Sequence, residues 1–114
     1  MKLLKTELPL PPTTNQMYGF KGYKKFLSRE SKDWLEEAQW QYKTSYKEEI
    51  KLEPVRLIVN FYLKRDRDVD NLKLILDSLQ GFIIKNDSQV VELHIMKHKD
   101  KTNPRVELMV DTLI

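Results

Sequence analysis

The spacing of apolar and polar residues along the chain predicts both strands and helices. From Val55 to Leu63 every second residue is apolar, which is the period of a strand with one buried face. From residue 31 to residue 50 the apolar side chains recur instead at helical spacing, and Trp40 lies off that stripe. The same two periods predict further strands at 3–8, 91–96 and 106–110 and a second helix at about 70–80.

Breaks in this pattern separate the segments. Prolines end the first strand, because proline has no backbone donor, and residues 13–25 are expected to form a long loop. Residues 85–88 have the composition of a turn. The order β-α-β-α-β-β predicts a single α+β domain over residues 1–114, with a mixed sheet and the helices packed on one face.

Each predicted helix has candidate capping residues. Ser28 or Ser31 can accept a hydrogen bond from the first free amides of the longer helix, and Asp68 or Asp70 can do so for the shorter one. In the shorter helix Lys73 lies four residues before Asp77, a spacing that favours an ion pair.

Composition narrows the class of protein. The chain has 114 residues, no cysteine and a formal charge of +3. The lack of cysteine excludes disulfides, thiolate metal sites and cysteine nucleophiles. No apolar run approaches the roughly 20 residues of a membrane span, and the first residues do not resemble a secretory signal. We therefore expect a cytoplasmic protein that acts without a membrane.

The charge is distributed unevenly. Residues 1–32 hold seven bases against two acids, and residues 97–105 hold four bases against one acid. Residues 33–53 are acidic, with six acids against three bases. Charge runs of this kind are commonly solvated faces, and they also fit two basic surfaces that face a phosphate backbone. The sequence leaves both interpretations open.

An acidic cluster follows the strand at 55–63. Asp66, Asp68 and Asp70 alternate along the chain, so their carboxylates project to one side of an extended segment. Two charges about 6 Å apart repel by about 3 kcal/mol at an effective dielectric constant of about 20. An arginine, a helix N-terminus, a raised pKa or a divalent cation must offset this repulsion. Mg²⁺ or Mn²⁺ fits, because both prefer oxygen ligands.

Asp87 is a further candidate ligand, since it lies in the turn that precedes the next strand. If the two strands are neighbours, their ends can bring Asp87 beside Asp68 and Asp70. The alternative is structural: the aspartates cap a helix and a turn, and Arg65 and Arg67 neutralise them locally. Spacing alone does not decide between the two.

Three blocks of the sequence resemble the RusA-type Holliday-junction resolvases, small bacterial endonucleases that prophages often encode. The first block is LPLPPTTN at 8–15. The second is RDVDNLK at 67–73, followed by LDSL at 76–79, and the third is NDSQV at 86–90. Their order and approximate spacing match the family, and together they cover nearly the whole chain.

This resemblance implies a Mg²⁺-dependent endodeoxyribonuclease that resolves four-way DNA junctions by paired phosphodiester hydrolysis, in recombination and repair. Mn²⁺ is the expected substitute for Mg²⁺. The resemblance assigns catalysis and metal binding to Asp68, Asp70 and Asp87, and a further catalytic role to Lys73.

Two departures from the family pattern bear on these roles. The stretch from Asp70 to Asp77 is one residue shorter than in the family, so Lys73 matches only across a gap. Asn86 replaces the first acid of the usual pair before Gln89, which removes one potential outer ligand.

The resemblance also implies DNA as the partner and a homodimer as the active form. A four-way junction has approximate two-fold symmetry, and a C2 dimer supplies two matched sites. Basic residues are expected to bind the backbone, and the aromatic residues of the 13–27 segment to contact unstacked bases at a branch point. The candidate DNA-binding residues are Asn15, Lys21, Lys24, Lys25, Arg29, Arg65, Arg67, Lys97, Lys99 and Lys101.

Two other functions fit the same residues. One is a module that binds branched DNA without catalysis, in which the acids serve only as caps. The other is a broader nuclease that cuts flaps or forks, because selectivity depends on how the dimer holds the DNA arms.

Overall fold

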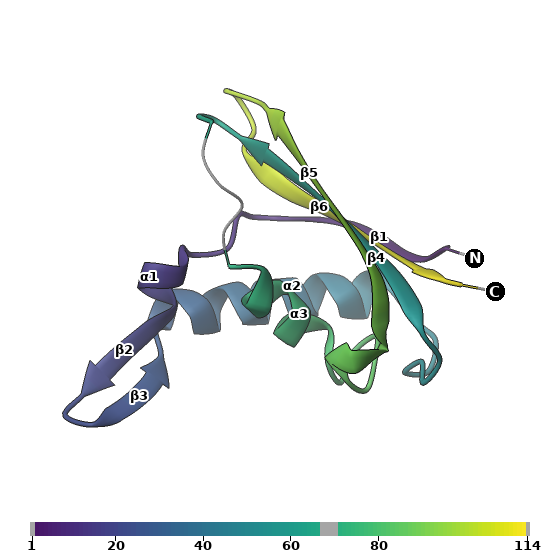
Figure 1. Ribbon diagram of the computed structural model, residues 1–114, viewed down its shortest axis with the longest axis horizontal. Helices are drawn as coiled ribbons and strands as arrows, with labels where there is room; N and C mark the ends of the chain where they lie inside the picture. The colour runs from purple at the N-terminus through teal and green to yellow at the C-terminus, as the bar shows by residue number, and fades with distance from the viewer. Residues whose placement is uncertain (1, 67–70, 114) are drawn as a thin grey trace.

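A four-stranded mixed sheet forms the centre of the molecule (Figure 1). The structure is a computed structural model that describes residues 2–66 and 71–113. The strand order is β1-β6-β4-β5, in which β4 and β5 run parallel and the other pairs are antiparallel. The strands are β1 (Lys2–Leu8), β4 (Val55–Leu63), β5 (Val90–Lys99) and β6 (Arg105–Thr112).

Two helices, α2 (Arg29–Ser45) and α3 (Leu72–Leu79), cover one face of this sheet (Figure 1). The apolar positions of β4 are all buried, as the two-residue period predicts. They share a core with Trp34, Ala38 and Tyr42 of α2 and with Ile75 of α3. The predicted α+β class, the mixed sheet and the helices on one face are therefore confirmed.

The segment predicted as a loop, residues 13–25, is more ordered than expected. It contains a short helix, α1 (Thr14–Met17), and most of an antiparallel hairpin of β2 (Tyr18–Lys21) and β3 (Lys24–Leu27). Each strand has only four residues and none of its side chains is fully buried, so no two-residue alternation of apolar side chains marks it in the sequence. The element order thus has an added helix and hairpin between the first strand and the long helix.

The helix boundaries also differ from the predicted ones. The Ser28 side chain accepts a hydrogen bond from the amide of Ser31 at 3.2 Å, so Ser28 is the N-cap and α2 begins at Arg29. The helix ends at Ser45 because Tyr46 adopts an extended conformation, in which its hydroxyl donates to the carbonyl of Glu49 at 2.7 Å. The apolar stripe extends beyond the helix because Tyr46 is still buried in the core, whereas Ile50, at the predicted end of the stripe, is 42% exposed.

The first described turn of α3 has an unexpected N-cap. Asn71 occupies that position in the left-handed region, with φ of 58°, and its side chain makes no capping hydrogen bond. The expected caps Asp68 and Asp70 lie outside the described residues.

The strand predicted at 91–96 is longer in the structure. β5 continues to Lys99 because it pairs with β4 over its whole length.

Among residues 2–66 and 71–113, no helix is both long enough and apolar enough to cross a membrane.

Candidate functional site

Hydrogen bonds hold the first and second sequence blocks together. The side-chain amide of Asn71 donates to the carbonyl of Pro12 at 2.7 Å. The Trp34 indole donates to the carbonyl of Pro9 at 2.8 Å, and the buried Ser31 hydroxyl donates to that of Met17 at 2.8 Å. The proline-rich segment cannot satisfy its carbonyls in a ladder, so these side chains satisfy them instead. The segment is thereby fixed against α2 and the start of α3.

Asn71 is held tightly where the chain enters α3. Asn71 is 6% exposed, and its positive φ is a backbone conformation that asparagine tolerates better than most residues do. Its Oδ1 is buried and accepts no hydrogen bond from any described residue.

Lys73 lies on the first turn of α3, close to the hairpin. Its ammonium group is 3.2 Å from the Asp77 carboxylate, which confirms the ion pair expected from their spacing. The hydrogen bond that Lys73 donates to Asp77 raises the pKa of Lys73, and the charge of Asp77 and the nearby Tyr18 side chain add to the effect. Lys73 is therefore a positive charge beside the Asn71 anchor, and no pattern in the sequence indicated that Tyr18 would approach it.

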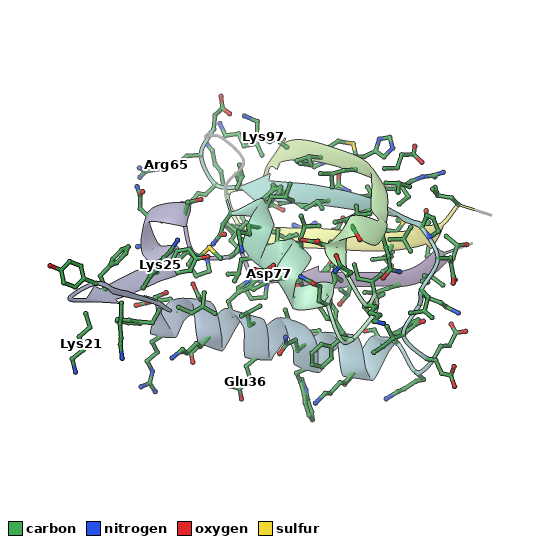
Figure 2. The ribbon with its side chains drawn as sticks, turned by 60° about the horizontal axis from the view of Figure 1, so that its bottom comes forward. Lys21, Lys25, Glu36, Arg65, Asp77 and Lys97 are labelled. Carbon is green, nitrogen blue, oxygen red and sulfur yellow. The ribbon has the colours of Figure 1, made fainter. Side chains whose placement is uncertain are left out.

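The exit of β4 forms a basic hollow with the end of β5. The Lys97 ammonium lies 3.3 Å from the Asp66 carboxylate, which ties the exit loop to β5. A hollow of about 380 Å³ opens here, and Figure 2 shows Arg65 and Lys97 at the same end of the molecule. Three bases, Arg65, Lys97 and Lys99, outnumber the single acid Asp66, so the hollow favours an anion such as a phosphate. Its lining residues are Leu63, Arg65, Asp66, Lys97, His98 and Lys99.

Asp87 is the first residue of a short 3₁₀ turn, η1 (Asp87–Gln89), that leads into β5. Asn86 and Gln89 form a reciprocal capping box around this turn. The Gln89 amide also donates to the carbonyls of Lys51 and Glu53, at 2.9 and 3.0 Å, which fixes η1 beside the start of β4. The third sequence block is therefore partly structural.

The Asp87 side chain is left exposed by this arrangement. No other described residue forms a hydrogen bond or ion pair with its carboxylate.

The structure does not bring Asp87 to the exit of β4 within one chain. The strands are neighbours, as the sequence analysis supposed, but they run parallel, with Val55 opposite Val90 and Leu63 opposite Lys99. The start of β5 therefore lies at the opposite end of the ladder from the exit of β4. From Val90 to Lys97 the strand extends about 23 Å, at roughly 3.3 Å per residue. The expected convergence of strand ends requires an antiparallel pair and is not found in a single chain.

Three of the predicted site residues, Arg67, Asp68 and Asp70, lie outside the described residues. Among the described residues, no group of three or more potential metal ligands occurs.

The remaining predicted DNA-binding residues lie on exposed elements. Asn15 lies on α1, Arg29 begins α2, and Lys101 lies in the turn after β5. Figure 2 shows Lys21 and Lys25 on the hairpin, which extends from the body of the domain. Arg29 is 4.0 Å from Asp33, an exposed pair that contributes little to stability.

Comparison with protein families identifies a matching family. The family model described as Endodeoxyribonuclease RusA matches residues 9–111. A comparison with curated proteins finds no match for the chain.

Proposed function

The chain belongs to the endodeoxyribonuclease RusA family, and on this premise we propose that it resolves four-way DNA junctions as a homodimer with two Mg²⁺-dependent sites. Membership makes the chain a DNA-binding endonuclease of the Holliday-junction resolvase type. The observation that carries the proposal is the family match, which includes all three blocks except the first residue of the first one.

We assign the metal to Asp68, Asp70 and Asp87, with Mn²⁺ as a substitute for Mg²⁺. Carboxylate oxygens are the ligands that these hard cations prefer, and the exposed Asp87 carboxylate is not engaged by another described residue. When bound, the ion supplies an activated water and stabilises charge on the phosphoryl oxygens. Lys73 adds a fixed positive charge for the scissile phosphate.

The parallel pairing of β4 and β5 leads us to propose that each site is shared between two chains. Asp87 and Asp66, which lies at the β4 exit beside Lys97, are at opposite ends of the same ladder, too far apart for one ion to bridge. A second copy that pairs its β5 antiparallel to the first reverses this order. Asp87 of the second copy then comes to the Lys97–Lys99 end of β5, beside Arg65 and Asp66.

The free edge of β5 suits such a pairing. This strand has β4 on one side and no described strand on the other. Four of its apolar side chains are exposed: Val91, Leu93, Ile95 and Met96. An edge strand with uncovered apolar side chains is a site at which a second chain can associate. A twofold axis across β5 would cover these side chains and create two identical sites, which matches the symmetry of the junction.

Basic residues around the β4 exit would bind the DNA backbone. Arg65, Lys97 and Lys99 line the hollow beside the shared site, and their charges favour phosphate there. Because such contacts release counterions, binding should weaken steeply as salt rises.

The test of a shared site is complementation between two inactive variants. Asp70→Asn and Asp87→Asn should each retain junction binding and lose Mg²⁺-dependent cleavage by about three orders of magnitude or more. When the two are mixed, refolded together and allowed to form heterodimers, one site per heterodimer is intact. Nicking of a four-way junction should then return to about a quarter of the wild-type rate, since random pairing gives half heterodimers with one working site each.

Two results would contradict parts of the proposal. If heterodimers form, as native mass spectrometry can show, and no nicking returns, each site lies within one chain. If the wild-type protein cuts no branched substrate with Mg²⁺ or Mn²⁺, the chain lacks the nuclease activity itself. A linear duplex and a three-armed fork, assayed beside the four-way junction, distinguish a strict resolvase from a broader nuclease.

A further inference from the structure

The β2–β3 hairpin extends away from the body of the domain (Figure 1). It forms its own two-stranded sheet, joined by a turn in which Gly22 has φ of 62°. A hairpin alone is marginally stable in water, so an extended one needs support at its base. The amide of Ser28 donates to the carbonyl of Met17 at 2.9 Å and closes that base. The Ser31 hydroxyl donates to the same carbonyl and fixes the base to α2.

Local contacts stabilise the hairpin from its base to its middle. The Phe26 ring packs so closely on Gly19 that a Cβ atom there would lie 2.5 Å from the ring, so residue 19 must be glycine for this packing. The Lys25 ammonium lies over the Tyr18 ring, 3.9 Å from its centre. These contacts give the hairpin a defined shape from its base to its middle.

The tip exposes aromatic side chains that a folded monomer gains nothing by exposing. Phe20 is 70% exposed and Tyr23 is fully exposed, whereas most other large apolar side chains of the described chain are buried. Lys21, Lys24 and Lys25 surround them, and residues 13–28 contain no acid. Aromatic rings that stack on bases, beside lysines that bind phosphates, are the chemistry that recognises unpaired nucleic acid.

The base of the hairpin adjoins the proposed nuclease site. The Tyr18 side chain approaches Lys73, and residues 9–17 are tied to Asn71 and α2. The hairpin therefore extends from the part of the domain that holds the start of α3. A four-way junction differs from linear duplex mainly at its centre, where base stacking is interrupted, so the aromatic tip of a hairpin whose base adjoins the cutting site can recognise that difference.

We propose that this hairpin inserts into the centre of the junction, where Tyr23 and Phe20 stack on the bases that border the branch point. Lys21, Lys24 and Lys25 bind the flanking phosphates. This inference rests on the proposed function, because it identifies the part of the branched substrate that the same protein recognises. Selectivity for junctions over linear DNA would then depend on the hairpin rather than on the metal site.

The test compares the double variant Tyr23→Ala/Phe20→Ala with the control Trp40→Ala. Trp40 is also an exposed aromatic residue, at 62%, but it lies on α2 beside Glu36 and Glu37. The full-length protein is titrated in EDTA onto a four-way junction that carries 2-aminopurine at the branch point, and onto a linear duplex of the same sequence. Wild-type protein and the control should raise the fluorescence, because the probe base unstacks.

The double variant should lose most of this fluorescence increase and bind the junction at least about tenfold more weakly, since two stacking contacts are removed. Its affinity for the linear duplex should change by less than about threefold, because all three lysines remain. Circular dichroism should show an unchanged fold, since the replaced side chains are exposed. A Tyr23→Trp variant should keep the fluorescence increase.

An unchanged fluorescence increase in the double variant would overturn the inference, and so would an equal loss with the Trp40→Ala control. Because these measurements are made without metal, they do not depend on cleavage. The proposed nuclease function fails separately, if wild-type protein does not cut the junction when Mg²⁺ is added.

Discussion

β4 and β5 lie side by side and have similar apolar alternation, yet one is buried and the other is exposed. Leu57 and Leu93 are paired across the two strands, with exposures of 0% and 41%. The next pair on the same face, Val59 and Ile95, shows the same contrast, at 0% and 37%. Both strands satisfy the same local pattern, so the difference comes from their positions in the sheet.

Position in the sheet determines which strand the helices cover. β4 has neighbours on both sides, and α2 and α3 pack on its apolar face. The opposite edge strand, β1, is covered as well, since Leu3, Leu4 and Leu8 are buried. β5 therefore has apolar residues that belong to the core face without the layer that would cover them, which is why we assign this edge to a second copy.

The largest expected change is in the free energy of unfolding when the paired leucines, Leu57 and Leu93, are replaced in turn. Leu57→Ala should lower the free energy of unfolding by about 3 kcal/mol, because it leaves a cavity in the core. Leu93→Ala should lower it by less than about 1 kcal/mol at protein concentrations where the monomer predominates. Urea denaturation followed by tryptophan fluorescence measures both. Equal losses at the two positions would show that β5 is covered within a single chain.

The next largest change is in self-association, and it shows whether a second copy covers β5. Ile95→Lys should weaken self-association by at least about 30-fold, since an unpaired charge at an apolar contact costs about 2 kcal/mol or more. Ile50→Lys is the matched control, because Ile50 is similarly exposed, at 42%, but lies outside the sheet. Sedimentation equilibrium gives the dimer dissociation constants. If Ile50→Lys dissociates the dimer and Ile95→Lys does not, the interface lies elsewhere.

The same contrast explains how much could be predicted from the sequence. Period two and helical spacing are local, so they located β4, β5 and α3 and gave the α+β class. Strand order and direction are set by contacts between distant residues, so the parallel pairing of β4 with β5 could not be read from either strand. For that reason the expected meeting of the end of β4 with the start of β5 was wrong, whereas the grouping of Asp87 with Asp68 and Asp70 stays a prediction.

The hairpin and the role of Asn71 were missed for a related reason. β2 and β3 bury no continuous apolar face, so they leave no periodic signal in the sequence. Asn71 resembled one more polar residue in an acidic run. Its contact with Pro12 joins segments far apart in the chain, so no local pattern in the sequence indicated it.

A smaller change in unfolding free energy is expected when two tyrosine hydroxyls, one on the covered side of the sheet and one on the uncovered side, are removed. On the covered side Tyr42 shares a buried 2.8 Å hydrogen bond with Ser78, and burial raises the pKa of Tyr42. On the other side Tyr62 of β4 donates to Glu107 at 3.0 Å. Tyr42→Phe should cost about 1 kcal/mol of unfolding free energy, with Ser78 still bonded to the carbonyl of Ile75.

Tyr62→Phe should cost about half as much or less, because water can replace the hydrogen bond to a partly exposed carboxylate. Thermal and urea unfolding of the two variants, measured side by side, gives the difference. A larger loss at Tyr62 would mean that the uncovered face, with its ion pairs, contributes more to stability than its exposure suggests.

The smallest effect concerns the turn that connects β5 to β6. The amide of Asp100 donates to the carbonyl of Leu63, which ties this turn to the end of β4. Backbone amides of Asn103 and Thr102, followed by the side chains of Arg105 and Thr102, lower the pKa of Asp100 to about 2. Because this pKa is below that of an unfolded aspartate, the charged form stabilises the fold above about pH 4.

That stabilisation should disappear as the pH falls from about 4 through 2, where the folded protein must also take up the proton. Asp100→Asn removes the titrating group and keeps an acceptor oxygen. The difference in urea midpoint between wild type and variant should therefore be largest at pH 5 and shrink toward pH 2. A difference that stays constant over this range would show that Asp100 holds the β5 end by its shape rather than by its charge.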